Sequence, residues 1–261
     1  MTDFSGKSVL VTGGSFGMGR ACAERFAKGG AKVLIVSNDE RSLEEAAASI
    51  GPQATAFLGD VRRAGDMEAA VREAVSRNDG LDVLACCAGI QRYGTVEDTP
   101  EETWDEVFAV NVKGVFLAGK YAVPAMRGRG GGAIVALSSV QAFASQNNVA
   151  AYTASKGALN ALVRAMALDH AADNITVNAV CPASVDTPML RRSADLFKGE
   201  GTVEDTLAAW GKGHPLGRIG RPEEIAELVA FLASPRARFI TGADVKIDGG
   251  ALAKLGIVLP D

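Results

Sequence analysis

The sequence predicts an α/β fold: a doubly wound parallel sheet of about seven strands with helices on both faces. Short apolar runs alternate with segments of helical apolar spacing along the whole chain. The runs are continuously apolar rather than alternating, which is typical of parallel strands buried on both faces. No linker, repeat or low-complexity segment interrupts the sequence, so we expect residues 1–261 to form a single domain.

Each predicted strand is a short apolar run bounded by polar residues or glycine. The runs lie at residues 8–14, 32–37, 54–61, 81–89, 132–139, 174–180 and 244–250. The chain has 30 glycines, more than average usage predicts, and many of them directly follow these runs. We therefore expect several strands to end in backbone turns with a functional role.

The segments between the runs carry helical spacing and helix start signals. The predicted helices cover residues 17–28, 39–50, 64–76, about 99–126, a stretch that carries Tyr152 and Lys156, and 221–232. Asn38 is the expected N-cap of the second helix. Thr99 and Pro100, followed by two glutamates, predict an N-cap and an N1 proline for the fourth. Residues 184–215 are less regular.

Composition argues against several functional classes. The formal net charge is −4 and no face is obviously basic, which argues against nucleic acid as a partner. No apolar segment approaches the roughly 18 residues of a membrane span, and the N-terminus lacks the pattern of a secretory signal. The spacing of the four cysteines fits neither a metal site nor a disulfide framework, which predicts a cytoplasmic protein with free thiols.

A glycine-rich turn joins the first predicted strand to the first helix, where a doubly wound, Rossmann-like sheet binds a dinucleotide. Glycine lets the backbone approach a pyrophosphate, and a helix N-terminus offers free N–H groups and a positive dipole end. The alternative is a tight turn with glycine for geometry alone. The position at the first junction favours a cofactor, and the expected contacts are Gly13, Ser15, Phe16, Gly17, Met18 and Gly19.

The end of the second strand should contact the adenosine ribose. A carboxylate there would favour NAD, and an arginine would favour NADP. The candidate positions are Ser37 and Asn38, with Asp39 just beyond. Neither a clear acid nor a base stands there, so both cofactors stay open at this point.

A proton-transfer pair is predicted at Tyr152 and Lys156, which share one face of a helix with Cβ atoms about 5–6 Å apart. An ammonium about 4 Å from a phenol contributes up to about 4 kcal/mol, which could lower its pKa from about 10 to as low as about 7. Desolvation would take back part of this lowering, and the positive nicotinamide ring of an oxidised cofactor would add to it. Tyr152 would then be a base for oxidation and an acid for reduction. Ser139, or alternatively Ser138, can donate a hydrogen bond to the substrate oxygen. A surface tyrosine beside a solvated lysine is the competing interpretation of an isolated pair.

Together these motifs resemble the short-chain dehydrogenase/reductase family over nearly the whole chain. The matching stretches are the TGxxxGxG turn at 12–19, Asp60 with Val61, Asn111 in an Asn-Val-Lys-Gly stretch, Ser139 thirteen positions before Tyr152, Lys156, and residues 221–226 and 248–250. The resemblance implies an oxidoreductase that transfers a hydride between NAD or NADP and a secondary alcohol or ketone.

The resemblance also implies roles for individual residues. Asn111 would hold a water in a proton relay, Ser139 would position the substrate carbonyl, and Lys156 would also bond the nicotinamide ribose. Further cofactor contacts implied by the family are Asp60, Val61, Ala88, Gly89, Tyr152, Lys156, Pro182, Val185 and Thr187. The family implies a homotetramer, in which helices within residues 104–126 and 152–170 pair across two-fold axes.

Two stretches depart from the family pattern. Cys86 and Cys87 stand where the family usually has two asparagines, so amide hydrogen bonds are expected to be lost there while packing is kept. Ala183 replaces a usual glycine, which tests whether that turn needs a positive φ.

The substrate site is expected to involve Ser139, Gln141, Tyr152, Gln91 and Ser184, beneath a lid at residues 184–215. The two glutamines suggest a polar substrate such as a sugar or sugar acid. Each of the polar residues could equally face water on the rim of the site.

Two other functions are kept as alternatives. One is a 3-oxoacyl-type carbonyl reductase, for which Arg191, Arg192 and Lys198 are candidate contacts to a carrier phosphate. The other is a cofactor-sensing binding protein without catalysis. Such proteins usually lose one of the four catalytic residues, and none is lost in this sequence.

Overall fold

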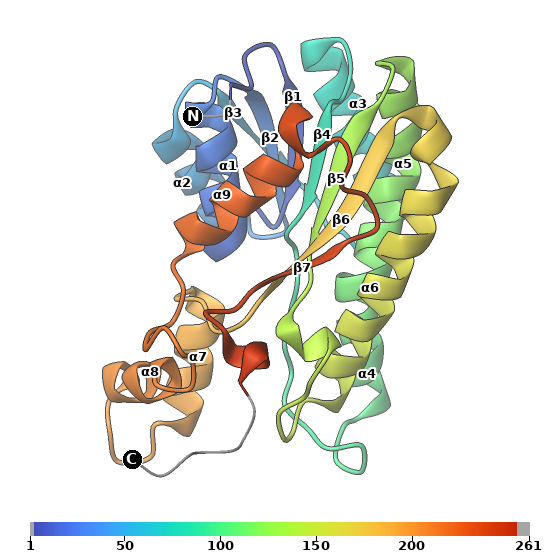
Figure 1. Ribbon diagram of the computed structural model, residues 1–261. Coiled ribbons are helices and arrows are strands. Elements are labelled where there is room, and N and C mark those ends of the chain that lie inside the picture. Colours follow the sequence, from blue (N-terminus) through green and yellow to red (C-terminus); the bar gives the residue numbers. More distant parts are fainter. Residues whose placement is uncertain (1–2, 255–261) are drawn as a thin grey trace.

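The computed structural model describes residues 3–254 as a sheet between two layers of helices (Figure 1). All seven strands are parallel, in the order β3-β2-β1-β4-β5-β6-β7. They span β1 Ser8–Thr12, β2 Lys32–Ser37, β3 Ala54–Leu58, β4 Val83–Cys86, β5 Gly132–Leu137, β6 Ile175–Pro182 and β7 Asp244–Ile247. The predicted doubly wound fold is therefore confirmed.

The strand order reverses direction at the pairing of β1 with β4. The chain first adds β2 and β3 on one side of β1, then returns to place β4 on its other side. Thr12 and Cys86, at the carboxyl ends of these two strands, are register partners. The loops that follow them diverge to opposite faces of the sheet, which opens the crevice where such sheets bind ligands.

Helices cover both faces of the sheet (Figure 1). They span α1 Gly17–Lys28, α2 Glu40–Ile50, α3 Ala64–Asn78, α4 Glu101–Phe108, α5 Gly114–Gly128, α6 Ala150–Asp169, α7 Pro188–Phe197, α8 Val203–Gly211 and α9 Pro222–Leu232. Alternate residues of each strand serve the two faces. Leu10 packs into the core beneath α3, α5 and α6, whereas Val9 and Val11 pack into the core beneath α1, α2 and α9.

Two of the predicted helix starts are displaced by one residue. The N-cap of α2 is Asp39 rather than Asn38, because the Asp39 carboxylate accepts a hydrogen bond from the Ser42 amide at 2.8 Å. The N-cap of α4 is Pro100 rather than Thr99. The Thr99 hydroxyl instead donates to the Thr95 carbonyl in the preceding turn.

The predicted helix over residues 99–126 contains a π-helical turn, Ala109–Lys113, between α4 and α5. The region 184–215 is more regular than expected, because it holds both α7 and α8. Thr187 caps the first of these helices, and Thr202 forms a capping box with Asp205 in the second.

Several strands are shorter than predicted. Both β3 and β4 end before the residues expected to contact a cofactor, so these residues lie in loops at the carboxyl edge of the sheet.

Among residues 3–254, no helix combines the length and apolar character that a membrane crossing requires. The same range contains no cluster of three or more histidine, cysteine, aspartate or glutamate side chains that could hold a metal ion.

A paired substitution tests this core. Leu10→Ala removes a fully buried side chain from the interior strand β1 and should lower the free energy of unfolding by about 2–5 kcal/mol, because a cavity is left. Leu216→Ala alters a side chain that is 70% exposed and should change the free energy of unfolding by less than about 0.5 kcal/mol. Urea unfolding of both variants measures the difference, and equal losses would contradict this assignment of the core.

Candidate active site

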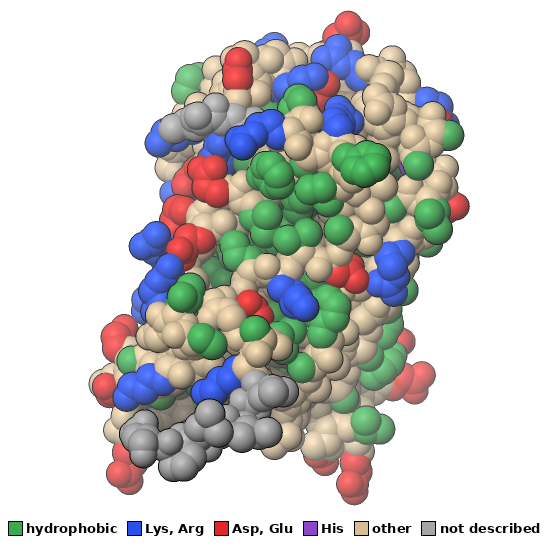
Figure 2. Space-filling view, in the orientation of Figure 1, with side chains coloured by type: hydrophobic (Ala, Val, Ile, Leu, Met, Phe, Trp, Pro, Cys, Tyr) green, Lys and Arg blue, Asp and Glu red, His purple; other side chains and the backbone are tan. Residues whose placement is uncertain are grey.

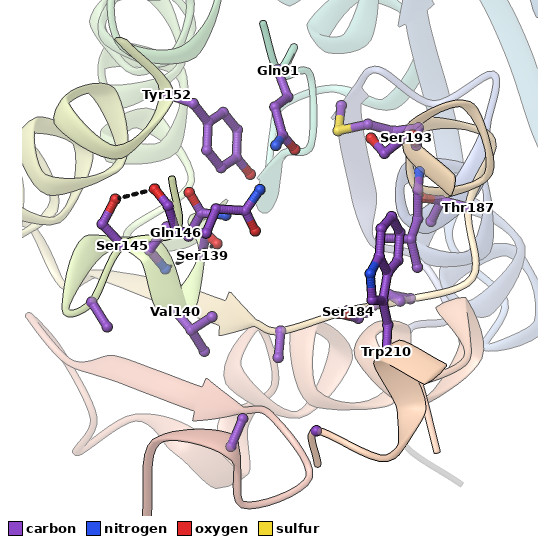
Figure 3. Close-up of a pocket in the computed structure, with 18 of the residues that line it drawn as sticks. Gln91, Ser139, Val140, Ser145, Gln146, Tyr152, Ser184, Thr187, Ser193 and Trp210 are labelled. Atoms are coloured by element: carbon purple, nitrogen blue, oxygen red, sulfur yellow. Dashed lines mark hydrogen bonds between the residues drawn. The ribbon is translucent and has the colours of Figure 1, made fainter. Parts of the chain in front are cut away.

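The four predicted catalytic residues come from three elements around one cavity. Asn111 lies in the π-helical turn. Ser139 is the second residue after the end of β5. Tyr152 and Lys156 lie in the first turns of α6. The cavity has a volume of about 660 Å³, and both Ser139 and Tyr152 line it. Figure 3 shows the Tyr152 ring pointing into this cavity.

Asn111 joins the loop after β4 to helix α6. Its Oδ1 accepts from the Ile90 amide at 2.8 Å, and its Nδ2 donates to the Ile90 carbonyl at 2.9 Å and to Ser155 Oγ at 3.0 Å. The Ser155 hydroxyl in turn donates to the Tyr152 carbonyl. The buried Asn111 side chain therefore holds the start of α6 against the cofactor edge of the sheet.

Two adjacent serines have different surroundings. Ser138 is buried, and its hydroxyl lies 3.5 Å from the Lys156 carbonyl in α6. Ser139 lines the cavity, and its Oγ accepts from the Gln141 amide at 3.1 Å. That contact leaves the Ser139 hydroxyl hydrogen available for a substrate oxygen. The geometry thus favours Ser139 over Ser138 as the donor.

The Lys156 ammonium is buried beneath the cavity. Its Nζ donates to the Leu137 carbonyl at 2.8 Å and lies 5.4 Å from the centre of the Tyr152 ring. Burial lowers the pKa of Lys156 to about 8, because the charged form loses its water.

The expected lowering of the Tyr152 pKa to about 7 is wrong for the groups that this chain supplies. Burial raises the pKa of Tyr152 to about 12, although the hydrogen bond with Ser139 acts in the opposite direction. Desolvation of the phenolate exceeds the attraction expected from the ammonium, and the ammonium lies against the face of the tyrosine ring.

The glycine-rich turn after β1 leaves an open helix N-terminus. Helix α1 begins at Gly17, its N-cap Phe16 makes no side-chain capping bond, and its first turn contains no acid. The amides of Gly17, Met18 and Gly19 are therefore free to bind an anion. This is the arrangement that a dinucleotide pyrophosphate requires.

Glycine is needed in this turn for close packing and for backbone conformation. A Cβ on Gly19 would lie 2.1 Å from the Gly13 carbonyl oxygen. Gly17 has a φ of 51°, and its Cα faces the Thr187 side chain at the base of the lid. The turn, α1 and the lid thus meet at one point.

The corner beyond β2 is built from hydroxyls. Ser37 Oγ lies 3.0 Å from Ser15 Oγ and accepts the Asp39 amide at 3.3 Å. Asn38 and Asp39 are exposed.

Asp60, in the loop after β3, pairs with Arg62, and these hydrogen bonds hold the pKa of its carboxyl below the usual value. Val61 beside it is buried in the core.

The loop after β4 runs directly over Lys156. The Ala88 amide lies 3.4 Å from the Thr12 hydroxyl, and a Cβ on Gly89 would be 3.7 Å from Lys156 Nζ. The two cysteines that replace the family asparagines keep the strand pairing through the backbone, since the Cys87 amide donates to the Thr12 carbonyl at 3.1 Å. Cys86 is buried in the core.

The turn after β6 does not need glycine. Among the residues described, the non-glycine positions with positive φ are Asp79, Asn148 and Asn174, and Ala183 is not one of them. Pro182 ends β6, and Val185 forms a bridge with Gly220. Val185 lies between the end of β6 and the start of α7.

The cavity brings together the predicted substrate residues from opposite walls. Gln91, Ser139, Gln141, Tyr152 and Ser184 all line it. Figure 3 shows Gln91 and Tyr152 on one side, with Trp210, Ser193 and Thr187 of the lid facing them. The predicted set is therefore assembled in one place.

Several lining residues had no distinguishing signal in the sequence. Tyr93 and Phe197 meet edge to face at 4.8 Å, which joins the loop after β4 to helix α7. Ser145, Gln146 and Ser193 also line the cavity. Arg92 does not line it, because its guanidinium binds Glu106 at 3.0 and 3.1 Å.

His214 is a buried lining residue at the end of the lid. Its Nδ1 lies 3.0 Å from the Trp210 carbonyl, which indicates that Nδ1 carries the hydrogen. Its Nε2 has no hydrogen-bond partner within residues 3–254. The contact fixes the ring beside Trp210 and closes that end of the cavity.

Comparison with known proteins gives consistent relatives. A family model described as enoyl-(acyl carrier protein) reductase matches residues 13–251. 2-(S)-Hydroxypropyl-CoM dehydrogenase 3 of Xanthobacter autotrophicus is 39% identical over 94% of this chain and 96% of its own. Dehydrogenase/reductase SDR family member 4 of Bos taurus is 36% identical over 95% and 88%.

A solved structure agrees with these sequence relatives. The ligand-free aldohexose dehydrogenase of Thermoplasma acidophilum superposes with a TM-score of 0.91 at 37% identity, covering 100% of this chain and 98% of that one. The names of these relatives are those of reductases and dehydrogenases, and this chain is an NAD(P)-dependent oxidoreductase acting on a secondary alcohol or ketone. It belongs to the short-chain dehydrogenase/reductase family.

Proposed function

We propose that Asn111, Ser139, Tyr152 and Lys156 carry the oxidation of a secondary alcohol, or the reduction of its ketone, in the 660 Å³ cavity. The observation that carries this proposal is the convergence of Ser139 and Tyr152 on one cavity, with Lys156 and Asn111 directly behind them. Bound NAD or NADP supplies the hydride chemistry. The open N-terminus of α1 and the loop over Lys156 fit such a dinucleotide.

Each residue has a distinct part in the reaction. The Ser139 hydroxyl holds the substrate oxygen, and the Tyr152 hydroxyl moves the proton to or from it. Lys156 places a positive charge beneath the Tyr152 ring and is itself held by the Leu137 carbonyl. Asn111 keeps α6, and with it Tyr152, in register with the sheet.

The cofactor contacts follow the carboxyl edge of the sheet. The turn from Gly13 to Gly19 would hold the pyrophosphate, and Ser37 and Asn38 would meet the adenosine ribose. Val185 and Thr187 would face the nicotinamide end from the base of the lid. A direct comparison of NAD and NADP affinities decides which cofactor the Ser37 corner prefers.

The lid argues against an acyl carrier as the bound partner, despite the description of the matching family model. Arg191 binds Asp186 through two contacts of 2.7 and 2.9 Å, and Lys198 binds Asp195 at 2.6 Å. Only Arg192 of the three predicted basic residues makes no ion pair within residues 3–254. A carrier phosphate would have to compete with these acids.

A sensor without catalysis is disfavoured because all four catalytic residues are present.

We propose that residues 1–261 form one domain with a lid at residues 184–215, and that four copies assemble as a homotetramer in the cytoplasm. The four free cysteines suit a reducing compartment.

Exposed apolar side chains support assembly: Trp104, Phe116 and Leu168 lie on α4, α5 and α6. Figure 2 shows a further apolar area on one face of the molecule. Phe239 is fully exposed, and Leu228, Phe231 and Ile240 are partly exposed.

Removing one hydroxyl tests the catalytic assignment. Tyr152→Phe keeps the ring against Lys156 but cannot move a proton, so turnover should fall by at least about a thousandfold. Cofactor affinity, followed by fluorescence titration, should change less than about threefold. Substantial surviving turnover with folded protein would contradict the role assigned to Tyr152.

The pH dependence of the two directions should differ. The raised Tyr152 pKa of about 12 keeps the phenol protonated at neutral pH, which suits the acid needed for ketone reduction. Alcohol oxidation needs the deprotonated form, so kcat/KM for oxidation should rise with pH, by up to about tenfold per unit from pH 7 upward. Initial rates in both directions between about pH 6 and pH 10 measure this, and oxidation that falls over that range would refute it.

The proposed assembly predicts four chains per particle in light scattering at micromolar concentration. Phe116→Asp places a charge on the apolar face of α5 and should produce smaller particles, because a charge is costly in a buried interface. Val96→Asp changes a side chain that is 87% exposed in a loop and serves as the matched control. A wild-type monomer under these conditions would rule out the homotetramer.

A further inference from the structure

The cavity walls are mostly apolar, and the polar side chains on them are uncharged. Of the lining residues within 3–254, none is Asp, Glu, Lys or Arg. Its hydrogen-bonding side chains are mainly carboxamides and hydroxyls, contributed by Gln91, Ser139, Gln141, Ser145, Gln146 and Asn147. A charged substrate group would lose its water there without meeting an opposite charge, which is unfavourable.

Two arginines next to lining residues in the sequence are paired outside the cavity. Arg92 follows the lining residue Gln91, but binds Glu106. Arg191 lies beside the lining residue Leu190, but binds Asp186. These pairs explain how a cavity between charged segments keeps a neutral interior.

One carboxamide on the wall is held in a fixed orientation. Gln141 Oε1 accepts from the Thr153 hydroxyl at 3.1 Å. Ser145 Oγ donates to the Gln146 carbonyl at 3.0 Å and lies 3.0 Å from the same Thr153 hydroxyl. Because the Gln141 oxygen is engaged with Thr153, its Nε2 group is the part left to donate into the cavity.

Gln141 lines the same cavity as Ser139 and Tyr152. The Gln141 amide donates to Ser139 Oγ at 3.1 Å, and the side chain is held by Thr153, the residue after Tyr152. A donor in this position can reach a second oxygen near the reacting carbon. A substrate with only one oxygen would leave this donor unpaired, which costs binding free energy.

We infer that Gln141 is a specificity-determining residue that donates a hydrogen bond to a second oxygen of an uncharged polyol or hydroxyketone, and that Thr153 positions it. This inference rests on the proposed function. In the reaction one secondary alcohol becomes a ketone: its hydride reduces NAD(P)⁺ to NAD(P)H, and its hydroxyl proton leaves through Tyr152. The second hydroxyl is bound and does not react. The cavity volume suits molecules up to the size of a sugar.

Three alcohols of similar shape test the inference. 2,3-Butanediol differs from 2-butanol by one hydroxyl, and 3-hydroxybutyrate differs from 2-butanol by a carboxylate in place of a terminal methyl. The wild-type enzyme should show the highest kcat/KM with the diol and the lowest with the hydroxy acid. In Gln141→Ala the diol-to-butanol ratio of kcat/KM should fall about tenfold. The ratio is unaffected by a general loss of folded or active enzyme.

Thr153 supplies the matched pair of variants. Thr153→Val removes the hydroxyl at nearly constant volume, so the ratio should fall toward that of Gln141→Ala. Thr153→Ser restores the hydroxyl and should restore the ratio, which a purely structural role of Thr153 would not require. The same diol-to-butanol ratio in the wild type and in every variant, or a clear preference for the hydroxy acid, overturns the inference and leaves the proposed function intact. No turnover of any of the three alcohols with either NAD or NADP overturns both.

Discussion

The parallel pairing of β1 with β4 is the constraint on which the rest of this molecule depends. The sheet grows outward from this pair in both directions, so every strand delivers its carboxyl end to the same edge. The glycine turn after β1 and the Ala88–Gly89 backbone after β4 therefore lie side by side. A dinucleotide needs both, one for its phosphates and the other beside the catalytic lysine.

Desolvation governs the electrostatics of the site more strongly than the attraction between its two key groups. Burial moves the pKa of Tyr152 up to about 12 and that of Lys156 down to about 8. The Leu137 carbonyl compensates the buried ammonium at 2.8 Å, so the lysine keeps its place beneath the ring. The protein thus holds a neutral phenol at the reacting position, which is the form that donates a proton to a carbonyl.

The lid completes the site without adding charge to it. Helices α7 and α8 bring Met189, Phe197 and Trp210 over the cavity, while Arg191 and Lys198 on the same segment turn to nearby acids. The contact between Phe197 and Tyr93 joins the lid to the loop after β4. An apolar cover above a floor of amides and hydroxyls selects molecules that carry oxygen atoms but no charge.

The sequence by itself determined the parallel sheet and the glycine turn, because apolar periodicity and turn chemistry are local properties. It proposed the four candidate catalytic residues from helix spacing and from the family resemblance. Two predicted helix starts were wrong by one residue, because the Asp39 carboxylate caps α2 and the Thr99 hydroxyl bonds the Thr95 carbonyl instead of capping α4. Only the tertiary structure decided three features. They are the raised pKa of Tyr152, the ion pair that holds Arg92 away from the cavity, and the ring contact between Tyr93 and Phe197. Burial and cavity walls arise from residues far apart in the chain, which no local pattern encodes.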